Sequence, residues 1–586
     1  MFLLFTSLLL VACGKSDDDD PVASSSSTMS DQGSEAGDPV TVSGKVRYEL
    51  VPPFPNCSGL DYASAELRPI RGATVHLIDA NSSELIDSDL ATESGDYALQ
   101  STAQREVFVR VRAELKQVGS PAWDVDVRDN TSNTNTSLGS RPLYVVDSNS
   151  FTMGDSDQVR NFTAATGWDG ASYSGYRAAA PFAILDTVYE VMLLVLEVDP
   201  AAQFAPLDIF WSTNNSTFRA ASLNTGINSG AIGTSFYVPQ LNSLFLLGME
   251  DDDTEEFDRH VIAHEWGHYF EDNFSRSDSA GGPHSLGQRL DMRLAFSEGW
   301  ATAFSGMALN NPRFCDTVGS QQRMGFGIHM EYDQFGPSGW FNEISVLSIL
   351  YDLWDTQVDG ADVSSLGFQP LFDVLVNEQA ETSAFASVFS FMKALKARNP
   401  EQATFIDSLL AQHSINGPGL DAYGSNETND ASAPDVLPIY TDIIPDGTPV
   451  TLCANSQFDG GYSGNKLSEY RYLRMLVTNP GSYIFSISTQ SPASPLPPPG
   501  FDCTDPANAG DPNNFQHSDP DFLLVRRGQV VAAGQSCTAN SEVTTADDLP
   551  AGDYVISLLE FRYADGNTPP DFPEQSCFEV TVSPGA

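Results

Sequence analysis

Two histidines and two glutamates in the middle of this chain have residue types and a spacing suited to catalysis at a metal ion. Residues 264–268 read His-Glu-Trp-Gly-His. On a helix, His264 and His268 are one turn apart, so both imidazoles project from one face and can bind the same ion. Glu265, between them, leans toward a water on that ion without being a ligand. Glu298, in Phe-Ser-Glu-Gly-Trp, is the best candidate for a third ligand, which leaves one position open, as in a catalytic zinc site.

The surrounding residues indicate the helix that must position these groups. Apolar residues flank the motif at helical spacing, and the acidic run 250–256 precedes it, where a helix N-terminus favours negative charge. The alternative is a helix whose histidines only pack or face solvent. His260 lies two turns from His268, about 12 Å along the axis, so we expect it to pack rather than share the ion. His284, in Gly-Gly-Pro-His, is expected to hold loop backbone.

Three segments carry a resemblance to a known family. Residues 261–272 resemble the active-site helix of the thermolysin-like zinc peptidases, the gluzincins. The Glu-Gly-Trp at 298–300, followed by Ala-Thr-Ala-Phe, is similar to the motif that supplies the third ligand in the fungalysin branch, and residues 342–354 resemble a later fungalysin helix. The resemblance implies one catalytic zinc ion with these ligands and this general base: His264, His268, Glu298 and Glu265.

The sequence also departs from that family. Fungalysin and thermolysin have an aspartate four residues after the third ligand, where it orients a zinc-bound histidine, and here that position is Thr302. Asp272 matches another family aspartate and is expected to take part of this role. No residue clearly matches the family's oxyanion donor, for which the candidates are His329, Tyr332 and Tyr351. The metzincin pattern is excluded, because positions 271 and 274 are Glu and Phe instead of Gly and His.

Length and charge set the broad class. At 586 residues the chain is expected to hold about three or four domains. A formal net charge of −49 argues against a nucleic-acid partner, because no basic stripe is present to neutralise phosphates. The acidic residues are spread along the chain, which indicates an anionic, soluble surface. Acidic clusters such as 251–253 are compatible with calcium binding, although the chain has no EF-hand spacing.

The N-terminus predicts export and a lipid anchor. Residues 2–12 are almost wholly apolar and end in Leu-Val-Ala before Cys13, a pattern that resembles the lipobox of bacterial lipoproteins. A run of this length suits a signal sequence and is too short to span a bilayer. Gly14 follows the cysteine, which by analogy favours the outer membrane. Residues 14–40 are rich in Ser, Asp and Gly and are expected to be a disordered tether.

The rest of the chain divides into three expected domains. Residues 41–165 alternate in short β runs and resemble the prealbumin-like sandwich of carboxypeptidase regulatory domains. Residues 166–435 form the expected α+β zincin domain with a helical C-terminal lobe, and strands at 234–238 and 244–247 are expected to pair with an extended substrate. Residues 436–586 return to β alternation and resemble the jelly-roll-like pre-peptidase C-terminal domain.

The cysteines fit an exported chain. With Cys13 set aside, six remain, an even number that indicates disulfides. Four of them lie in the last 140 residues and are expected to form two bridges in one of three connectivities: Cys453, Cys503, Cys537 and Cys577. Cys57 and Cys315 either pair across a domain boundary or stay free.

The function predicted from these features is hydrolysis of peptide bonds by an exported, lipid-anchored zinc endopeptidase. Its partners are then a protein or peptide substrate and a membrane. One alternative is a non-catalytic surface lipoprotein whose zinc is structural, which the threonine at 302 and the missing oxyanion donor favour. A second alternative is an aminopeptidase, although the chain has no Gly-x-Met-Glu-Asn motif.

Overall fold

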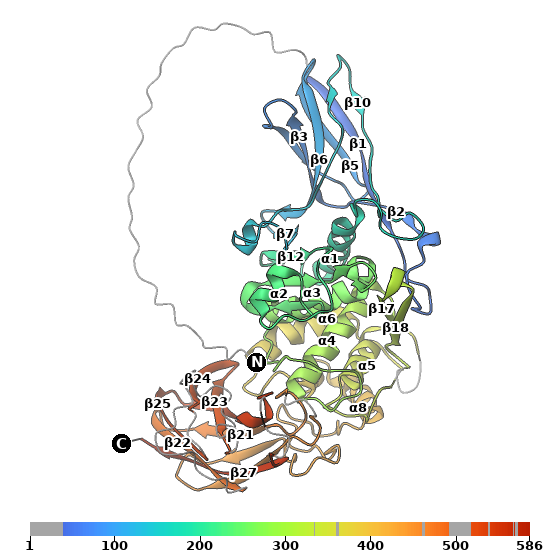
Figure 1. The fold of residues 1–586 in the computed structure, drawn as a ribbon. Coiled ribbons are helices and arrows are strands. Elements are labelled where there is room, and N and C mark those ends of the chain that lie inside the picture. Colours follow the sequence, from blue (N-terminus) through green and yellow to red (C-terminus); the bar gives the residue numbers. More distant parts are fainter. Residues whose placement is uncertain are drawn as a thin grey trace, which may run out of the picture.

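The structure is a computed structural model that describes residues 39–585, except 333, 359–362, 460–462, 492–516, 537–539, 567 and 569–571. The protein is multidomain and rich in β-sheet, with several helices. Figure 1 shows N-terminal strands at the top, helices in the middle and a C-terminal group of strands at the bottom. The lipobox cysteine and the linker up to residue 38 lie outside the described residues.

The N-terminal strands form two sheets. In the first, the long strand β1 pairs with all four others; its members are β1 (Pro39–Leu50), β2 (Glu66–Pro69), β5 (Asp96–Thr102), β10 (Gln158–Val159) and β11 (Phe162–Ala164). The second sheet has nine strands: β3 (Ala73–Asp79), β4 (Leu85–Leu90), β6 (Glu106–Gln117), β7 (Trp123–Arg128), β8 (Val145–Asp147), β9 (Phe151–Thr152), β12 (Leu207–Trp211), β13 (Phe236–Val238) and β14 (Ser243–Leu246). Every second residue in the first half of β6 is buried, as the period of a strand requires.

The nine-stranded sheet joins the N-terminal strands to the helical part of the molecule. Its main order is β13-β14-β12-β7-β6-β3-β4, and β12 pairs in parallel with β7, with Leu207 opposite Val125. The sheet therefore crosses residue 165, which is the expected end of the N-terminal sandwich. At the other end of the order, β13 pairs with β14 and with no further strand among the described residues, so one edge of β13 is open.

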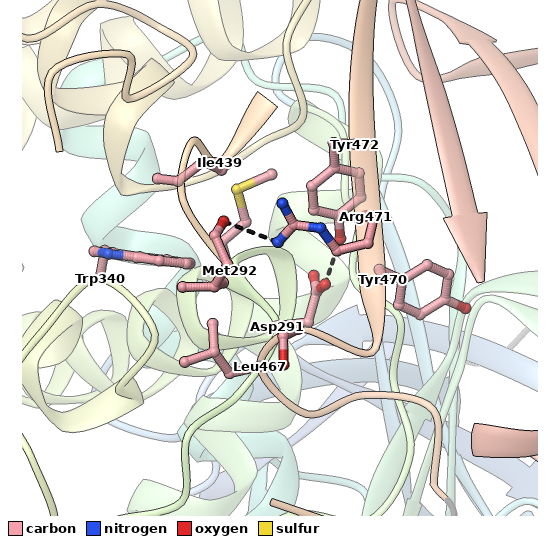
Figure 2. A pocket seen from close by; sticks show the side chains of 10 residues that line it. Asp291, Met292, Trp340, Ile439, Leu467, Tyr470, Arg471 and Tyr472 are labelled. Atoms are coloured by element: carbon pink, nitrogen blue, oxygen red, sulfur yellow. Dashed lines mark hydrogen bonds between the residues drawn. The ribbon is translucent and has the colours of Figure 1, made fainter. Parts of the chain in front are cut away.

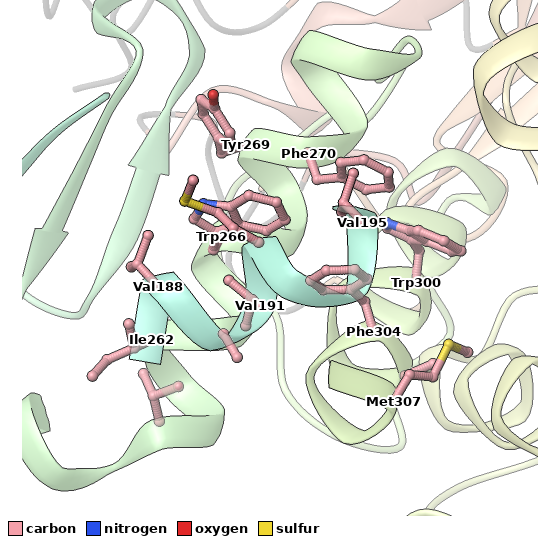
Figure 3. Close-up of a cluster of buried hydrophobic side chains, with 14 of the residues drawn as sticks. Val188, Val191, Val195, Ile262, Trp266, Tyr269, Phe270, Trp300, Phe304 and Met307 are labelled. Carbon is pink, nitrogen blue, oxygen red and sulfur yellow. The ribbon is translucent and has the colours of Figure 1, made fainter. Parts of the chain in front are cut away.

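Three helices share one apolar core next to this sheet: α1 (Ala179–Val198), α3 (Arg259–Phe274) and α4 (Met292–Leu309). Figure 3 shows valines of α1 beside aromatic side chains of α3 and α4. The ring of Trp266 stacks on that of Phe270, with 5.7 Å between the ring centroids, and on that of Phe304, with 5.5 Å between the centroids. Helix α1 is long and apolar enough to cross a membrane, but 72% of its apolar window is buried inside the protein, as expected for a core helix.

Two glycines let the helices approach closely. A Cβ on Gly267 of α3 would lie 2.9 Å from the Cα of Ala301 in α4. A Cβ on Gly299 of α4 would lie 2.9 Å from the carbonyl oxygen of Glu343 in α5 (Glu343–Trp354). Since neither contact leaves room for a side chain, the glycines of the His-Glu-Trp-Gly-His and Glu-Gly-Trp motifs set the spacing of three helices.

The remaining elements of the middle part surround these helices. The expected helical C-terminal lobe is present and contains these elements: α5, α6 (Phe368–Asp373), a π-helical turn (Val374–Gln379), α7 (Val388–Arg398) and α8 (Ala403–Gln412). Helix α2 (Leu223–Ser229) precedes β13. A small antiparallel sheet lies beside α3 and contains β15 (Gly248–Met249), β16 (Asp253–Thr254), β17 (Arg313–Val318) and β18 (Met324–His329).

The C-terminal strands form two sheets around a separate core. The first sheet contains β19 (Tyr440–Ile443), β21 (Tyr470–Val477), β26 (Gly552–Glu560), β23 (Pro520–Arg526) and β24 (Gln529–Gly534). The second contains β20 (Val450–Asn455), β27 (Gln575–Pro584), β22 (Gly481–Ser491) and β25 (Ser541–Leu549). The two sheets agree with the expected sandwich.

The C-terminal sandwich contacts the N-terminal end of α4 directly. Asp291 caps α4 by accepting the N–H of Arg293 at 3.1 Å, and the hydroxyl of Tyr472 in β21 donates to the same carboxylate. The Arg293 guanidinium lies 4.4 Å from the ring centroid of Tyr470. Figure 2 shows Asp291 beside Tyr472 in the small pocket at this contact. The helix that carries Glu298 is therefore held by the last domain.

Two disulfides are present among the described residues. Cys57 is bonded to Cys315, 258 residues later, and Cys453 is bonded to Cys577. The first bridge links the N-terminal region to β17. The sequence left open whether these two cysteines pair or stay free, and in the structure they pair. The second is one of the pairings expected in the C-terminal domain, while Cys503 and Cys537 lie outside the described residues.

Candidate metal centre

Helices α3 and α4 bring three ligand atoms together. His264 Nε2 and His268 Nε2 are 3.1 Å apart, and Glu298 Oε2 lies 3.2 Å from the first and 3.4 Å from the second. A tetrahedral zinc ion with bonds of about 2.0–2.1 Å separates its ligand atoms by about 3.3–3.4 Å. The three side chains therefore fit one zinc ion, and the two imidazoles project from α3 on one face, as the four-residue spacing predicts.

The other ring nitrogen of each histidine has its own partner. His264 Nδ1 lies 2.9 Å from the hydroxyl of Thr302, and His268 Nδ1 lies 3.2 Å from the hydroxyl of Ser297. Ser297 in turn donates to Glu271 Oε2 at 2.6 Å. Such partners fix the tautomer that leaves Nε2 free to bind a metal. Thr302 thus contacts His264 from the position of the family aspartate, with a hydroxyl instead of a carboxylate.

Asp272 does not contact either histidine ligand in the described contacts. Its carboxylate accepts the hydroxyl hydrogen of Tyr237 in β13 at 2.8 Å. The carboxylate that reaches His268, through Ser297, belongs to the neighbouring residue Glu271. Burial raises the pKa of Glu271 to about 7. Sequence reasoning missed this pair, although Glu271 follows His268 by three residues on the same helix.

Glu265 is buried beside the ligands. Only 8% of the residue is exposed, and burial raises the pKa of its carboxyl group, while His264 and His268 oppose the rise. The backbone N–H of Tyr237 also acts on this carboxyl group, which places Glu265 next to the open edge strand β13. A carboxylate in this position can accept a proton from a water molecule and return it to a leaving group.

Glu298 Oε2 has three histidine partners: His264, His268 and His284. Burial alone would raise its pKa, but His268 and His284 hold the pKa of Glu298 well below its usual range. The group is therefore a carboxylate, the form that binds a metal.

His284 is the residue that sequence reasoning assigned to the loop and that the structure places at the centre. Its Nε2 lies 3.4 Å from Glu298 Oε2 and 3.4 Å from Glu343 Oε2. Its Nδ1 lies 3.3 Å from the carbonyl oxygen of Gly282, so the expected contact with loop backbone is also present. Burial lowers the pKa of His284, but the neighbouring Glu298 and Glu343 raise that pKa to about 10. The only prior signal was its place between the two motifs.

The other histidine and tyrosine candidates lie elsewhere. Gly306, two turns after Glu298 and so about 12 Å further along α4, lies against the ring of Tyr351. The ring of His329, at the end of β18, stacks on that of Tyr332 at 4.4 Å. Tyr351 therefore lies near the C-terminal end of α4, and His329 and Tyr332 flank Met330 in the chain, whose side chain also lies against Gly306. The remaining histidine on α3, His260, is 5% exposed, and its Nδ1 contacts the hydroxyl of Ser305 at 3.1 Å, as a packed residue would.

Comparison with known proteins agrees with this geometry over one part of the chain. Residues 206–413 match the mycolysin C-terminal domain family. The match covers α3, α4 and α5 and every ligand of the candidate centre. This is a peptidase-related protein. None of the curated proteins compared with the chain matches it.

Solved structures give only weak similarity to this peptidase-related protein. The pre-peptidase C-terminal domain of collagenase from Bacillus anthracis is 11% identical, with a TM-score of 0.15, over 24% of this chain and 93% of that one. PliG of Aeromonas hydrophila, a periplasmic inhibitor of g-type lysozyme, is 6% identical, with a TM-score of 0.14, over 24% of this chain and 96% of that one. At such scores no conclusion about fold or function follows.

Proposed function

We propose that this protein is a zinc-dependent endopeptidase of the gluzincin type. The observation that carries the proposal is the set of three ligand atoms 3.1–3.4 Å apart, with a buried glutamate beside them. The match to the mycolysin C-terminal domain supports a peptidase over the same residues. When bound there, zinc would supply a Lewis acid that polarises a carbonyl group and makes a water molecule more acidic.

Glu265 is the general base in this proposal. Its carboxylate accepts a proton as the water oxygen attacks the scissile carbonyl carbon, and it then delivers that proton to the nitrogen of the leaving amine as the C–N bond breaks. Burial supports this role because it raises the pKa of the carboxyl group toward the pH at which both transfers must occur.

The open edge of β13 is the proposed substrate-binding strand. An extended peptide can pair with it through main-chain hydrogen bonds, in the mode of β-augmentation. The contact between Tyr237 and Glu265 supports this placement, since a peptide on that edge would lie beside the general base. His284 is a positioning residue, because its Nε2 contacts Glu298 Oε2, the oxygen that also faces His264 and His268, and connects it to Glu343.

The proposed location of the protein is the bacterial cell envelope. The lipobox ending in Cys13 supports export and a lipid anchor on a bacterial envelope, with a protein or peptide as substrate. The two disulfides support an oxidising compartment. The charge of −49 supports the absence of a nucleic-acid partner.

Metal content and proteolysis test the proposal together. Purified protein is expected to contain one zinc ion and to cleave a quenched casein substrate until a chelator is added. Glu265→Gln should retain zinc and lose cleavage, whereas His264→Ala should lose both. Full cleavage by the Glu265→Gln protein would refute the assigned base, and zinc without cleavage in the native protein would favour the structural-zinc alternative. Cleavage of N-terminally blocked peptides distinguishes an endopeptidase from an aminopeptidase.

A further inference from the structure

A second group of acidic side chains lies at the start of the zinc helix, outside the candidate metal centre. Each of Asp253, Glu255 and Asp316 offers a carboxylate oxygen, and these oxygens all lie within 4.8 Å of one another. Asp253 is in β16, Glu255 follows it, and Asp316 is in the paired strand β17. Asp258, the residue just before α3, faces the same strand, because its Oδ2 accepts the N–H and the hydroxyl hydrogen of Thr317 at 3.0 and 2.7 Å.

These carboxylates are buried without enough partners. Asp253, Glu255 and Asp258 are 8%, 3% and 1% exposed. One oxygen of each, together with Asp316 Oδ1, is shielded from solvent and has no hydrogen-bond partner. Burying a carboxylate in this way costs free energy unless a cation compensates it.

The neighbouring glutamate, Glu256, differs from these carboxylates because it has a positively charged partner. Glu256, also buried, is paired with the guanidinium of Arg177. Among the residues that the structure describes, no lysine or arginine forms an ion pair with any of the four carboxylates of the group. Burial and the nearby Asp316 raise the pKa of Asp253 to about 8, which reflects the same uncompensated charge.

The donors decide which cation fits. All are carboxylate oxygens, and hard oxygen donors suit calcium or magnesium instead of zinc. Magnesium keeps several of its waters and requires a near-ideal octahedron, whereas calcium accepts six to eight oxygens in flexible geometry, including bidentate carboxylates. We propose that Asp253, Glu255 and Asp316, with Asp258 beside them, form a structural calcium site.

The position of the proposed calcium site indicates a structural role for the ion. Asp253 pairs with Val318 across β16 and β17, and Asp258 leads directly into α3, whose second turn carries His264. A calcium ion bound here would tie the segment that precedes the zinc helix to a strand that follows α4. It would thereby hold the N-terminal end of α3 in place while using none of the zinc ligands.

Calcium binding is tested on the full chain with the Glu265→Gln change, loaded with zinc, because that protein cannot digest itself. At a calcium concentration about a hundredfold above the dissociation constant, the melting temperature should rise by about 5 °C. Adding Glu255→Gln and Asp316→Asn should abolish the rise and lower the bound calcium by one ion per chain. Without calcium this variant should melt at or above its parent, because a repulsion between buried charges has been removed.

Glu250→Gln is the matched control. It removes one negative charge three residues from Asp253, but the Glu250 carboxylate accepts the N–H of Tyr173, so the calcium-dependent rise should remain. Equal calcium content in the parent and the double variant, or an equal rise with magnesium, would overturn the proposal.

A measurement on the Glu265→Gln protein alone tests the calcium site even if the variant with Glu255→Gln and Asp316→Asn does not fold. Amide exchange in residues 253–258 and 313–318 should slow when calcium is added, and unchanged exchange in both segments would also overturn the site. Zinc content and casein cleavage are measured separately, so failure here is distinct from failure of the peptidase proposal.

Discussion

Replacing Thr302 by valine removes a single hydroxyl while keeping the shape of the side chain. That hydroxyl oxygen lies 2.9 Å from His264 Nδ1, and the His264 side chain is 16% exposed. When His264 binds a metal through Nε2, Nδ1 carries the hydrogen and donates it to Thr302. Loss of a partly buried neutral hydrogen bond costs about 0.5–1.5 kcal/mol, and loss of such a supporting contact weakens metal binding by about 10–100-fold. A tenfold loss of zinc affinity corresponds to about 1.4 kcal/mol, which lies within the range for the lost hydrogen bond. We therefore expect a loss of about tenfold.

Competition with a chromogenic chelator measures that affinity directly. Thr302→Val should bind zinc about tenfold more weakly than the native protein, and full cleavage activity should return when zinc is raised in proportion. Thr302→Ser keeps the hydroxyl and is the matched control, with an affinity close to native. Native zinc affinity in the valine variant would refute the idea that this hydroxyl orients His264.

Three further changes test other contacts. His284→Gln should lower zinc affinity about tenfold at an unchanged melting temperature, and native affinity would contradict a positioning role. Gly267→Ala should cost about 1–3 kcal/mol in chemical unfolding by pushing α3 from α4, whereas Gly566→Ala, whose Cβ would meet none of the described atoms within 4 Å, should cost little. Burial lowers the pKa of His413 to about 4; the unfolded chain therefore gains a proton first as pH falls, and stability should drop by about 3 kcal/mol between pH 6.5 and 4. That drop should be absent in His413→Gln, and an identical pH profile would contradict the assignment.

Local spacing was sufficient to predict that two histidines of the candidate centre share one helix face. A four-residue interval on a helix fixes a shared face, so His264 and His268 could be paired without knowing the fold. Glu298 needed the family resemblance, because thirty residues of chain separate it from the helix it meets.

The supporting contacts depend on how two helices face each other, and sequence spacing does not contain that information. Asp272 and Glu271 differ by one position, which is about 100° around a helix. This rotation directs the first toward Tyr237 of β13 and the second toward Ser297 of α4. His284 was passed over for the same reason, since only the folded loop brings it to Glu298.

The sheet topology could not be predicted from the sequence either. Alternation correctly indicated strands on both sides of residue 165, but it carries no information about which strands pair. The parallel pairing of β7 with β12 joins segments about eighty residues apart and turns two expected domains into neighbours in one sheet.

The bridge between Cys57 and Cys315 has a consequence for any maturation of this protein. Peptidases are often switched on when a cut frees an inhibitory leader, but here a cut anywhere between those cysteines would leave both fragments covalently joined. The nicked form would migrate as one band until a reductant was added. Whatever the N-terminal region does, it remains attached to the rest of the chain for as long as the surroundings stay oxidising.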